Sequence, residues 1–351
     1  MHEFSSCIIA WQKQHGRHDL PWQKTRDPYR VWLSEIMLQQ TQVGTVIPYY
    51  ARFLERFPDI AHLAAADEDA VLQHWSGLGY YSRARNLHRA AKAIAEQHQG
   101  KFPQHFEQIV ALPGIGRSTA AAISAFAFGK RFAILDGNVK RVLARYFGIE
   151  GYPGEKKIEN SLWEKAESIL PPSEIEVYTQ AVMDLGASIC SRSRPECSAC
   201  PLQKGCVAFQ DQRVSELPTR KAKKVIPVKQ TGMLIMVHNG DVFLEKRPSK
   251  GIWGGLWSFP EMGMEQEAEK YSQEAFRVSA ETVEILPILE HTFTHFKLLI
   301  SPCLVTVRKP SNEATLPEGV WLAMEEAVDA AIPAPVRKLL LQIGGQVNLG
   351  Q

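Results

Sequence analysis

Leu112-Pro113-Gly114-Ile115-Gly116-Arg117-Ser118-Thr119-Ala120 joins two stretches whose apolar residues recur with helical spacing. Gly114 and Gly116 carry no side chain, so backbone amides beside them can approach a ligand closely. Ser118 and Thr119 are helix-capping residue types, and we expect them to cap the alanine-rich helix that follows. Free amides at a helix N-terminus bind anions, so the stretch predicts a phosphate-binding hairpin. The alternative is a helix–helix turn that binds nothing.

Around this hairpin, the sequence predicts a compact all-α domain over residues 1–213. Apolar side chains recur three and four residues apart, as at Ile60, Leu63 and Ala64. Glycine and proline breaks, such as Gly77-Leu78-Gly79, divide the region into short segments. The loops between the segments are short, which is typical of helices packed into one unit.

Beyond this domain, the composition changes twice. Residues 214–229 are basic and contain prolines, which predicts an interdomain linker. Residues 230–351 then show strand patterns, and Asn239-Gly240 between two apolar runs predicts a β-hairpin. We expect a helix over residues 265–279 and further strands over residues 298–307 and 320–322. The second domain is therefore expected to be α+β.

The overall composition bounds the class of protein. A chain of 351 residues is too long for one ordinary core, which agrees with two domains. Hydrophobic residues at 45% and charged residues at 22% exclude wholesale disorder, collagen and a disulfide-dense miniprotein. The sequence shows neither a membrane-spanning apolar run nor a secretory signal, so we expect a cytoplasmic protein without a membrane partner. A net charge of +2 permits a nucleic-acid partner without arguing for one.

Four of the six cysteines are crowded into one short stretch. Cys190, Cys197, Cys200 and Cys206 predict metal ligation, because a disulfide framework would spread its cysteines through a secreted chain. Structural zinc usually pairs two CxxC motifs across a longer loop, whereas this stretch has one CxxC with unequal arms. That spacing favours an iron–sulfur cube held by four thiolates, with zinc as the alternative. We expect the site to organise a loop rather than to react.

Two carboxylates are candidates for catalysis. Glu35 lies on a predicted helix among apolar and amide side chains, where poor hydration should raise its pKa toward that of a general acid. Asp136 begins another predicted helix, where aspartate commonly serves as an N-cap. On either helix alone, an ordinary surface or capping residue is the favoured interpretation.

A basic and aromatic stretch follows the Gly77–Gly79 turn. Residues 80–89 contain tyrosines and arginines and no acid. A solvated helix face explains the arginines equally well. The position after a tight turn also fits a wedge that enters a stack of bases.

Taken together, these features resemble the MutY family of adenine DNA glycosylases, within the endonuclease III superfamily of helix-hairpin-helix DNA repair enzymes. The resemblance is carried by four features in one order, namely Ser34-Glu35-Ile36-Met37-Leu38-Gln39-Gln40-Thr41-Gln42, the Leu112–Ala120 hairpin, Leu135-Asp136-Gly137-Asn138 and the four-cysteine loop. It covers the whole catalytic domain and, more weakly, the second domain.

The resemblance implies a base excision repair enzyme that removes adenine mispaired with 8-oxoguanine or guanine. The expected partner is double-stranded DNA with such a mispair, the expected cofactor is a [4Fe-4S] cluster on the four cysteines, and a monomer is expected. Glu35 would protonate the departing adenine and handle the attacking water. Asp136 would stabilise the sugar cation, electrostatically or by transient bonding. The adenine must leave the stack to reach them.

The resemblance also assigns contacts to DNA. Wedging or orphan-guanine contacts fall on Gln40, Leu78 and Tyr80, and positions near the flipped base are Trp22, Gln23 and Gln180. Ser118 stands where the superfamily's lyases carry a lysine nucleophile, which implies base removal with little strand nicking. The other DNA-binding positions in this resemblance are Gly114, Gly116 and Asn138.

The second domain resembles a Nudix-like reader of 8-oxoguanine. Gly251–Pro260 is similar to the entry to a Nudix box, but Gln273-Glu274-Ala275-Phe276 lacks the acidic pattern that binds metal for hydrolysis. Phe293-Thr294-His295 matches the family's lesion loop, with threonine where serine is usual. The alternative is a loop that only packs on its own core.

Two other kinds of protein remain as alternatives. A Nudix hydrolase with a DNA-binding domain is disfavoured by the missing acidic motif. A damage-binding protein without activity is disfavoured by the pairing of Glu35 with Asp136.

Overall fold

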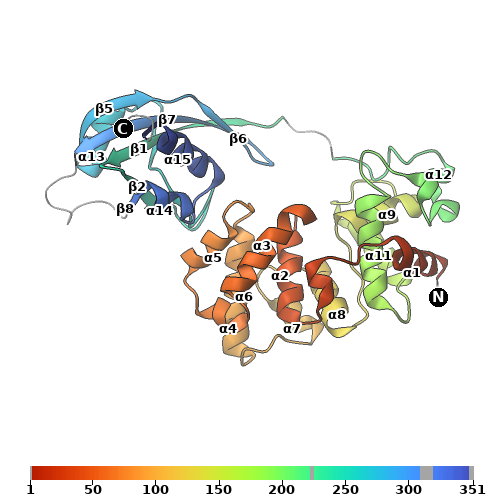
Figure 1. Cartoon of the computed structure of the whole chain (residues 1–351). Helices are drawn as coiled ribbons and strands as arrows, with labels where there is room; N and C mark the ends of the chain where they lie inside the picture. The colour runs from red at the N-terminus through yellow and green to blue at the C-terminus, as the bar shows by residue number, and fades with distance from the viewer. Residues whose placement is uncertain (1, 222–224, 309–318, 348–351) are drawn as a thin grey trace. The chain divides into compact units, whose positions relative to one another are not determined.

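The computed structural model describes residues 2–221, 225–308 and 319–347. The predicted linker (214–229) and second domain (230–351) each include residues outside this described part. Contacts between Cα atoms divide the chain into two compact units (Figure 1). The first comprises Met1–Ala65 and Asn86–Lys223, and the second comprises Ala66–Arg85 and Lys224–Gln351.

The first unit is helical, which confirms the predicted all-α class. α6 starts in the second unit and continues through the first. The elements are α1 (Glu3–His15), η1 (Pro21–Lys24), α2 (Pro28–Leu38), α3 (Val43–Arg56), α4 (Ile60–Ala65), α6 (Ser82–Gln97), α7 (Phe106–Ala111), α8 (Arg117–Phe128), α9 (Gly137–Tyr146), α10 (Lys156–Ser168), α11 (Ile175–Ser188), η2 (Cys197–Ala199), η3 (Gln203–Gly205) and α12 (Val207–Gln210).

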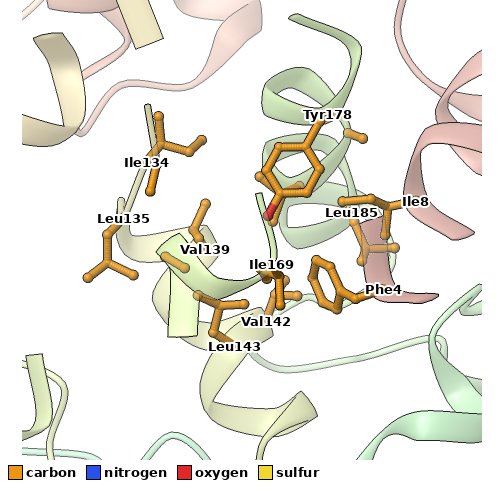
Figure 2. Close-up of a cluster of buried hydrophobic side chains, with 14 of the residues drawn as sticks. Phe4, Ile8, Ile134, Leu135, Val139, Val142, Leu143, Ile169, Tyr178 and Leu185 are labelled. Atoms are coloured by element: carbon orange, nitrogen blue, oxygen red, sulfur yellow. The ribbon is translucent and has the colours of Figure 1, made fainter. Parts of the chain in front are cut away.

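A buried apolar cluster joins α1, α9 and α11 (Figure 2). The cluster includes Phe4 and Ile8 of α1, Val139 of α9 and Leu185 of α11, and all four side chains are buried. Leu135, from the extended segment just before α9, belongs to the same cluster. Burial of side chains of this size stabilises the fold by about 1.5–3 kcal/mol each. The cluster therefore fixes the position of Leu135 and, with it, the backbone that carries Asp136.

The predicted hairpin joins α7 to α8, but its capping prediction is wrong. Gly116 is the N-cap of α8, so Ser118 and Thr119 lie within its first turn. The Ser118 hydroxyl instead accepts a hydrogen bond from the Leu135 amide (2.9 Å), and Thr119 Oγ1 accepts one from Gln39 Nε2 (3.3 Å). A residue already inside the first turn points its side chain away from the free amides that a cap satisfies.

The second unit contains a mixed sheet, which confirms the predicted α+β class. The order along the main path is β3-β2-β1-β7-β5, with β4 on β1, β6 on β7 and β8 on β2. β1 and β7 run parallel, and their neighbours are antiparallel. The elements are α5 (Glu68–Trp75), β1 (Val228–His238), β2 (Asp241–Lys246), β3 (Trp257–Ser258), β4 (Glu261–Met262), α13 (Ala268–Phe276), β5 (Ser279–Ile285), β6 (Leu289–Thr292), β7 (Lys297–Arg308), β8 (Gly319–Ala323), α14 (Met324–Asp329) and α15 (Ala334–Val347).

The Asn239-Gly240 hairpin is confirmed. His238 pairs with Asp241, and the two loop residues have φ values of 49° and 87°, as an Asn-Gly turn requires. The helix predicted over residues 265–279 is shorter, because Gln266 closes a turn on the Gly263 amide before α13 and Arg277 ends it in a left-handed conformation.

Both faces of the central strand are covered. Leu234 and Met236 of β1 pack in a core with Phe276 of α13 and Val305 of β7. The alternate residue Ile235, which points to the opposite face, is also fully buried. Among the described residues, no helix is both long enough and apolar enough to cross a membrane.

Candidate active site

Glu35 lies where two hollows of the first unit adjoin. It lines a pocket of about 250 Å³ together with Trp22, Gln23 and Gln180. It also lines a groove of about 1400 Å³ that contains Asp136. The two predicted carboxylates therefore face adjoining space, although they are far apart in the sequence.

Helix α2 holds Glu35 through its cap and its apolar face. Asp27 accepts a hydrogen bond from the Tyr29 amide (2.8 Å) at the start of the helix, and Pro28 occupies the first helical position. Leu33 and Met37 are fully buried, whereas Glu35 is only partly buried at the wall of the pocket.

The environment of Glu35 favours its protonated form. Burial raises the pKa of Glu35 to about 8, and the negative charge of Asp136 adds to the increase. At neutral pH, Glu35 is therefore mostly protonated. A protonated carboxyl at the wall of a ligand-sized pocket can act as a general acid.

Asp136 has more polar surroundings. Its Oδ1 accepts a hydrogen bond from the Val139 amide (2.7 Å), which confirms its role as the N-cap of α9. Burial raises its pKa, but hydrogen bonds from the backbone of Val139 and Asn138 and the positive charge of Arg141 oppose the increase. Groups beside Asp136 therefore favour its ionised form against the effect of burial, whereas burial and the charge of Asp136 both favour the protonated form of Glu35.

Ser118 connects the hairpin to the segment that carries Asp136. Its hydroxyl accepts the amide proton of Leu135, the residue directly before Asp136. Ser118 also lines the groove. The hairpin therefore supports the segment that carries the second carboxylate.

Gly114 makes the hairpin possible. Its φ of 79° lies in the left-handed region, and a Cβ at this position would lie 2.7 Å from the Cβ of Asn86. Only glycine avoids both the strain and the clash.

The small pocket brings together the three residues predicted near a flipped base. Trp22 is 7% exposed, and its ring lies edge-on to Tyr50 at 5.5 Å. Gln23 Oε1 accepts from the Leu20 amide (3.1 Å), and its Nε2 donates to the Arg17 carbonyl (2.9 Å). A pocket of about 250 Å³ with aromatic and amide walls is large enough for a purine base.

The groove gathers most of the DNA-binding positions predicted in the first unit. Gln40 follows α2 with a φ of 58° and is exposed. Asn138 Oδ1 accepts from Arg141 (2.8 Å), and Arg141 also donates to the Cys190 carbonyl (2.7 Å). Basic side chains that line the groove are Arg17, Lys140, Arg141, Arg145, Arg192, Arg220 and Lys221.

The second unit holds the other predicted positions. Tyr80 is 43% exposed with a φ of 49°, whereas Leu78 is 5% exposed. Arg83 is buried and donates to the Leu78 and Gly79 carbonyls, so this arginine supports the turn. Of the two predicted wedge residues in this turn, the structure exposes Tyr80.

The predicted lesion loop connects β6 to β7. The Phe293 amide donates to the Phe296 carbonyl (2.9 Å), which closes a tight turn. Thr294 and His295 are exposed, and the Phe293 ring lies 5.6 Å from Trp253. The loop therefore exposes a hydroxyl and an imidazole next to the packed rings of Phe293 and Trp253.

The cysteine loop follows α11 and includes η2 and η3. Burial raises the pKa of Cys200 to about 11, and the charges of Cys190, Cys206 and Cys197 add to the increase, so the four thiols are neighbours. Arg145 Nη1 donates to Cys190 Sγ (3.3 Å). Within the described residues, no three ligating side chains surround a single ion position. Four thiols without histidine are the donor set of an iron–sulfur cube.

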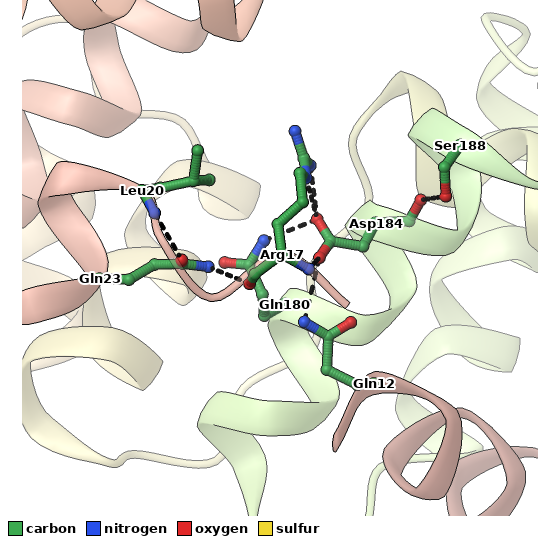
Figure 3. Close-up of polar contacts among 7 residues, drawn as sticks. All are labelled: Gln12, Arg17, Leu20, Gln23, Gln180, Asp184 and Ser188. Carbon is green, nitrogen blue, oxygen red and sulfur yellow. Dashed lines mark hydrogen bonds and ion pairs between the residues drawn. The ribbon is translucent and has the colours of Figure 1, made fainter. Parts of the chain in front are cut away.

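Two polar residues escaped the sequence analysis. Arg17 lines both hollows. Asp184 is 2% exposed and pairs with it (Figure 3). Asp184 interrupts the apolar stripe of α11, which is a usable signal, whereas nothing in the sequence marks Arg17.

The fold and site define a class of protein, and comparisons with known proteins agree. Residues 33–168 match the HhH-GPD superfamily of base excision DNA repair proteins, and residues 231–342 match the NUDIX domain. A solved thermostable thymine-DNA glycosylase is 31% identical and covers 59% of this chain and 95% of its own, with a TM-score of 0.55. An endonuclease III solved with DNA, at 22% identity and a TM-score of 0.51 over 60% of this chain and 96% of its own, shares the fold. The chain is a DNA glycosylase with an added NUDIX domain.

The particular family follows from a relative that matches over both domains. The adenine DNA glycosylase of Buchnera aphidicola subsp. Acyrthosiphon pisum is 40% identical over 340 residues, which are 96% of each chain. The chain belongs to the adenine DNA glycosylase family, the MutY family, as the sequence predicted.

Proposed function

We propose that this glycosylase removes adenine from mispairs with 8-oxoguanine or guanine in base excision repair. The observation that carries the proposal is the position of Glu35, between a base-sized pocket and a basic groove that also holds Asp136. Arginines and lysines along the groove suit the phosphates of double-stranded DNA. A flipped adenine in the pocket would place its glycosidic bond near both carboxylates.

Each carboxylate has a distinct role in the proposed reaction. Glu35 donates its proton to the departing adenine and can then accept a proton from the attacking water. Asp136, which accepts a hydrogen bond from the Val139 amide of α9, stabilises in its ionised form the positive charge that develops on the sugar, by its field or by a transient bond.

We further propose that the enzyme is monofunctional. The residue at the hairpin position of a lyase nucleophile is Ser118, and its hydroxyl is bound to the Leu135 amide. A hydroxyl cannot form the imine through which an amine cleaves the strand. The expected product is an abasic site in an unbroken strand.

The four cysteines fit a [4Fe-4S] cluster, which we propose as the cofactor. When bound, the cluster would hold the loop of residues 190–206 in one conformation and supply no step of base removal. Arg141 of α9 binds both Asn138 and the Cys190 carbonyl, so it would link the ordered loop to α9.

The NUDIX domain is proposed to read 8-oxoguanine through Phe293, Thr294 and His295. Its α13 contains Gln273-Glu274-Ala275-Phe276 in place of an acidic metal-binding helix, which supports recognition rather than hydrolysis. We also propose a two-domain division near residues 214–229, a monomeric enzyme, and cytoplasmic action on the nucleoid.

A duplex assay tests this function. Purified enzyme is incubated with a labelled duplex containing adenine opposite 8-oxoguanine, and the strand is analysed with and without alkali. Alkali-dependent scission at the adenine is expected in the wild type, and Asp136→Asn should slow it at least about a hundredfold, because a single electrostatic contact to a developing charge has this magnitude. An intact strand after alkali would refute the function.

A further inference from the structure

Helix α5 is bound along one face to the NUDIX domain, and both belong to the second compact unit. Asp69 Oδ1 accepts from Lys246 Nζ (2.6 Å), and Asp69 Oδ2 accepts from Trp257 Nε1 (3.3 Å). Gln73 Nε2 donates to the Asp329 carbonyl (2.8 Å). Residues four apart lie on the same face of a helix, so this face of α5 is the attached one.

The C-terminal end of α5 is fixed by a serine. Ser76, the C-cap of the helix, donates from its hydroxyl to the Ile332 carbonyl (2.9 Å) and accepts from Arg337 Nη2 (3.2 Å). Both partners belong to the stretch that matches the NUDIX domain. One hydroxyl therefore makes two hydrogen bonds to that domain, directly before the turn that carries Tyr80.

The turn after Ser76 has a backbone that its surroundings must hold. Gly77, Gly79 and Tyr80 have φ values of 95°, 74° and 49°. A tyrosine in the left-handed region is strained, and such a conformation persists only where neighbouring groups enforce it. The support of this turn therefore decides where the exposed Tyr80 ring lies.

Trp75 and Arg83 join the turn to α5. Trp75 is fully buried, and its Nε1 donates to the Gly79 carbonyl (3.1 Å). The guanidinium of Arg83 lies 5.3 Å from the centre of the Trp75 ring and 5.5 Å from the centre of the Tyr80 ring. The position of the Tyr80 ring therefore depends, through Arg83, on the last residue of α5.

The helix after the turn is bound to the same domain. Arg85, in the first turn of α6, donates from Nη1 to the Gly254 carbonyl. A Cβ at Gly255 would lie 3.4 Å from Glu68 Oε1 and 3.7 Å from Leu72 Cδ1, so this NUDIX backbone lies close to α5. The NUDIX domain therefore holds the turn from both ends.

We propose that the NUDIX domain holds the Tyr80 turn for entry into DNA, that Ser76 is the positioning residue, and that this contribution does not depend on the lesion. Insertion of a wedge costs free energy because bases must unstack, and an aromatic side chain already held in place loses less entropy on insertion. The contribution should therefore be equal opposite guanine and opposite 8-oxoguanine, whereas lesion reading would favour one partner base. The inference rests on the proposed function, since it takes the mispaired duplex as substrate and Tyr80 as one of its contacts.

The test measures adenine excision opposite guanine and opposite 8-oxoguanine, in one duplex sequence under single-turnover conditions at saturating enzyme. Ser76→Ala removes both hydrogen bonds of the hydroxyl to the NUDIX domain. Both rates should fall by the same factor, about fivefold or more, because Arg337 and the Ile332 carbonyl each lose a partner. Ser168→Ala is the control, since Ser168 ends α10 and donates to the Lys165 carbonyl within the same helix.

A double-mutant cycle separates positioning of the turn from a general loss of structure. In a Tyr80→Ala background, Ser76→Ala has no ring to position and should change neither rate further. A substitution that merely weakened folding would slow the Tyr80→Ala enzyme as well. Arg337→Ala leaves the sequence of α5 and the turn unchanged, so it should reproduce the effect of Ser76→Ala and is the test if Ser76→Ala does not fold.

Three results would overturn the inference: wild-type rates in Ser76→Ala or in Arg337→Ala, a loss confined to the 8-oxoguanine duplex, or an undiminished loss in the Tyr80→Ala background. A wild-type enzyme that excises adenine from neither duplex would instead refute the proposed function, so the two failures are distinguishable.

Discussion

At the scale of single residues, the site depends on two carboxyl groups in unlike surroundings. Burial and the negative charge of Asp136 raise the pKa of Glu35 to about 8. Burial raises the pKa of Asp136 as well, but backbone hydrogen bonds from Val139 and Asn138 oppose that increase. On this difference we base the proposal that Glu35 is the acid and Asp136 the electrostatic group.

The rate of adenine excision should therefore depend on pH in a definite direction. The active form carries the proton on Glu35, so the single-turnover rate should fall as pH rises through about 8. It should also fall in acid, when Asp136 takes up a proton. A pH series with one mispaired duplex measures both limbs, and a rate that increased steadily from pH 7 to about 9 would contradict the acid assignment.

Glu35→Gln should abolish excision and yet stabilise the fold. The folded state raises the pKa of Glu35 from 4.5 to about 8, so the wild type binds more protons when folded and loses stability as pH rises between these values. The glutamine variant has no such loss. Its gain in melting temperature should be small near pH 4 and grow toward about pH 8. Thermal unfolding of both proteins across this range measures the gain, and a gain that shrank with pH would exclude a raised pKa.

At the scale of elements, short connections place the catalytic groups. The Leu112–Ala120 hairpin reaches the segment before α9 through Ser118 and reaches the end of α2 through Thr119. This hairpin therefore contacts both the end of the helix that carries Glu35 and the residue directly before Asp136. Its conformation should matter for stability as well as for DNA binding.

Gly114→Ala should destabilise the first unit. The substitution forces a left-handed alanine and brings its Cβ to 2.7 Å from the Cβ of Asn86. We expect the free energy of unfolding to fall by about 2 kcal/mol or more. Gly44→Ala is the control, because Gly44 lies in α3 with open space around it, and it should be stabilising by about 0.5–1 kcal/mol. Denaturant unfolding compares the two, and equal stabilities would refute the strain.

A second prediction at this scale concerns the nucleophile. Ser118→Lys places an amine in the groove beside Asp136, and we expect it to convert part of the product into nicked strands without alkali. Ser118→Ala, which removes the hydroxyl without adding an amine, should leave the strand intact. Gel analysis without alkali distinguishes them, and an alanine variant that nicked as much as the lysine variant would remove the explanation.

At the scale of the whole molecule, the two units carry different parts of the proposed task. The first holds the pocket, the groove and the cysteine loop, and the second holds the exposed Tyr80 turn and the Phe293–Phe296 loop. α5 belongs to the second unit, where Asp69 accepts from Lys246 Nζ (2.6 Å). A cut near residue 224 would therefore remove contacts of α5 as well as the NUDIX domain, so point substitutions are the cleaner test.

His295→Ala should reduce the preference for adenine opposite 8-oxoguanine over adenine opposite guanine. The side chain is exposed, so the substitution should leave folding unaffected while it removes a polar contact worth about 1 kcal/mol, or about fivefold in rate. Excision from the two duplexes gives the preference. Glu325→Ala, an exposed position on α14, is the control, and an unchanged preference in His295→Ala would remove this residue from lesion recognition.

The sequence by itself determined the class of each domain and the Asn239-Gly240 hairpin and proposed the two carboxylates, because these depend on local periodicity, turn chemistry and recognisable motifs. It misjudged Ser118 as a cap, since its true partner, Leu135, is distant in the chain. Only the tertiary structure placed Glu35 beside Asp136 and set Arg17, Asp184 and Gln180 behind one pocket. Burial, and the hydrogen bonds between separate segments that burial enforces, exist only once the helices have packed.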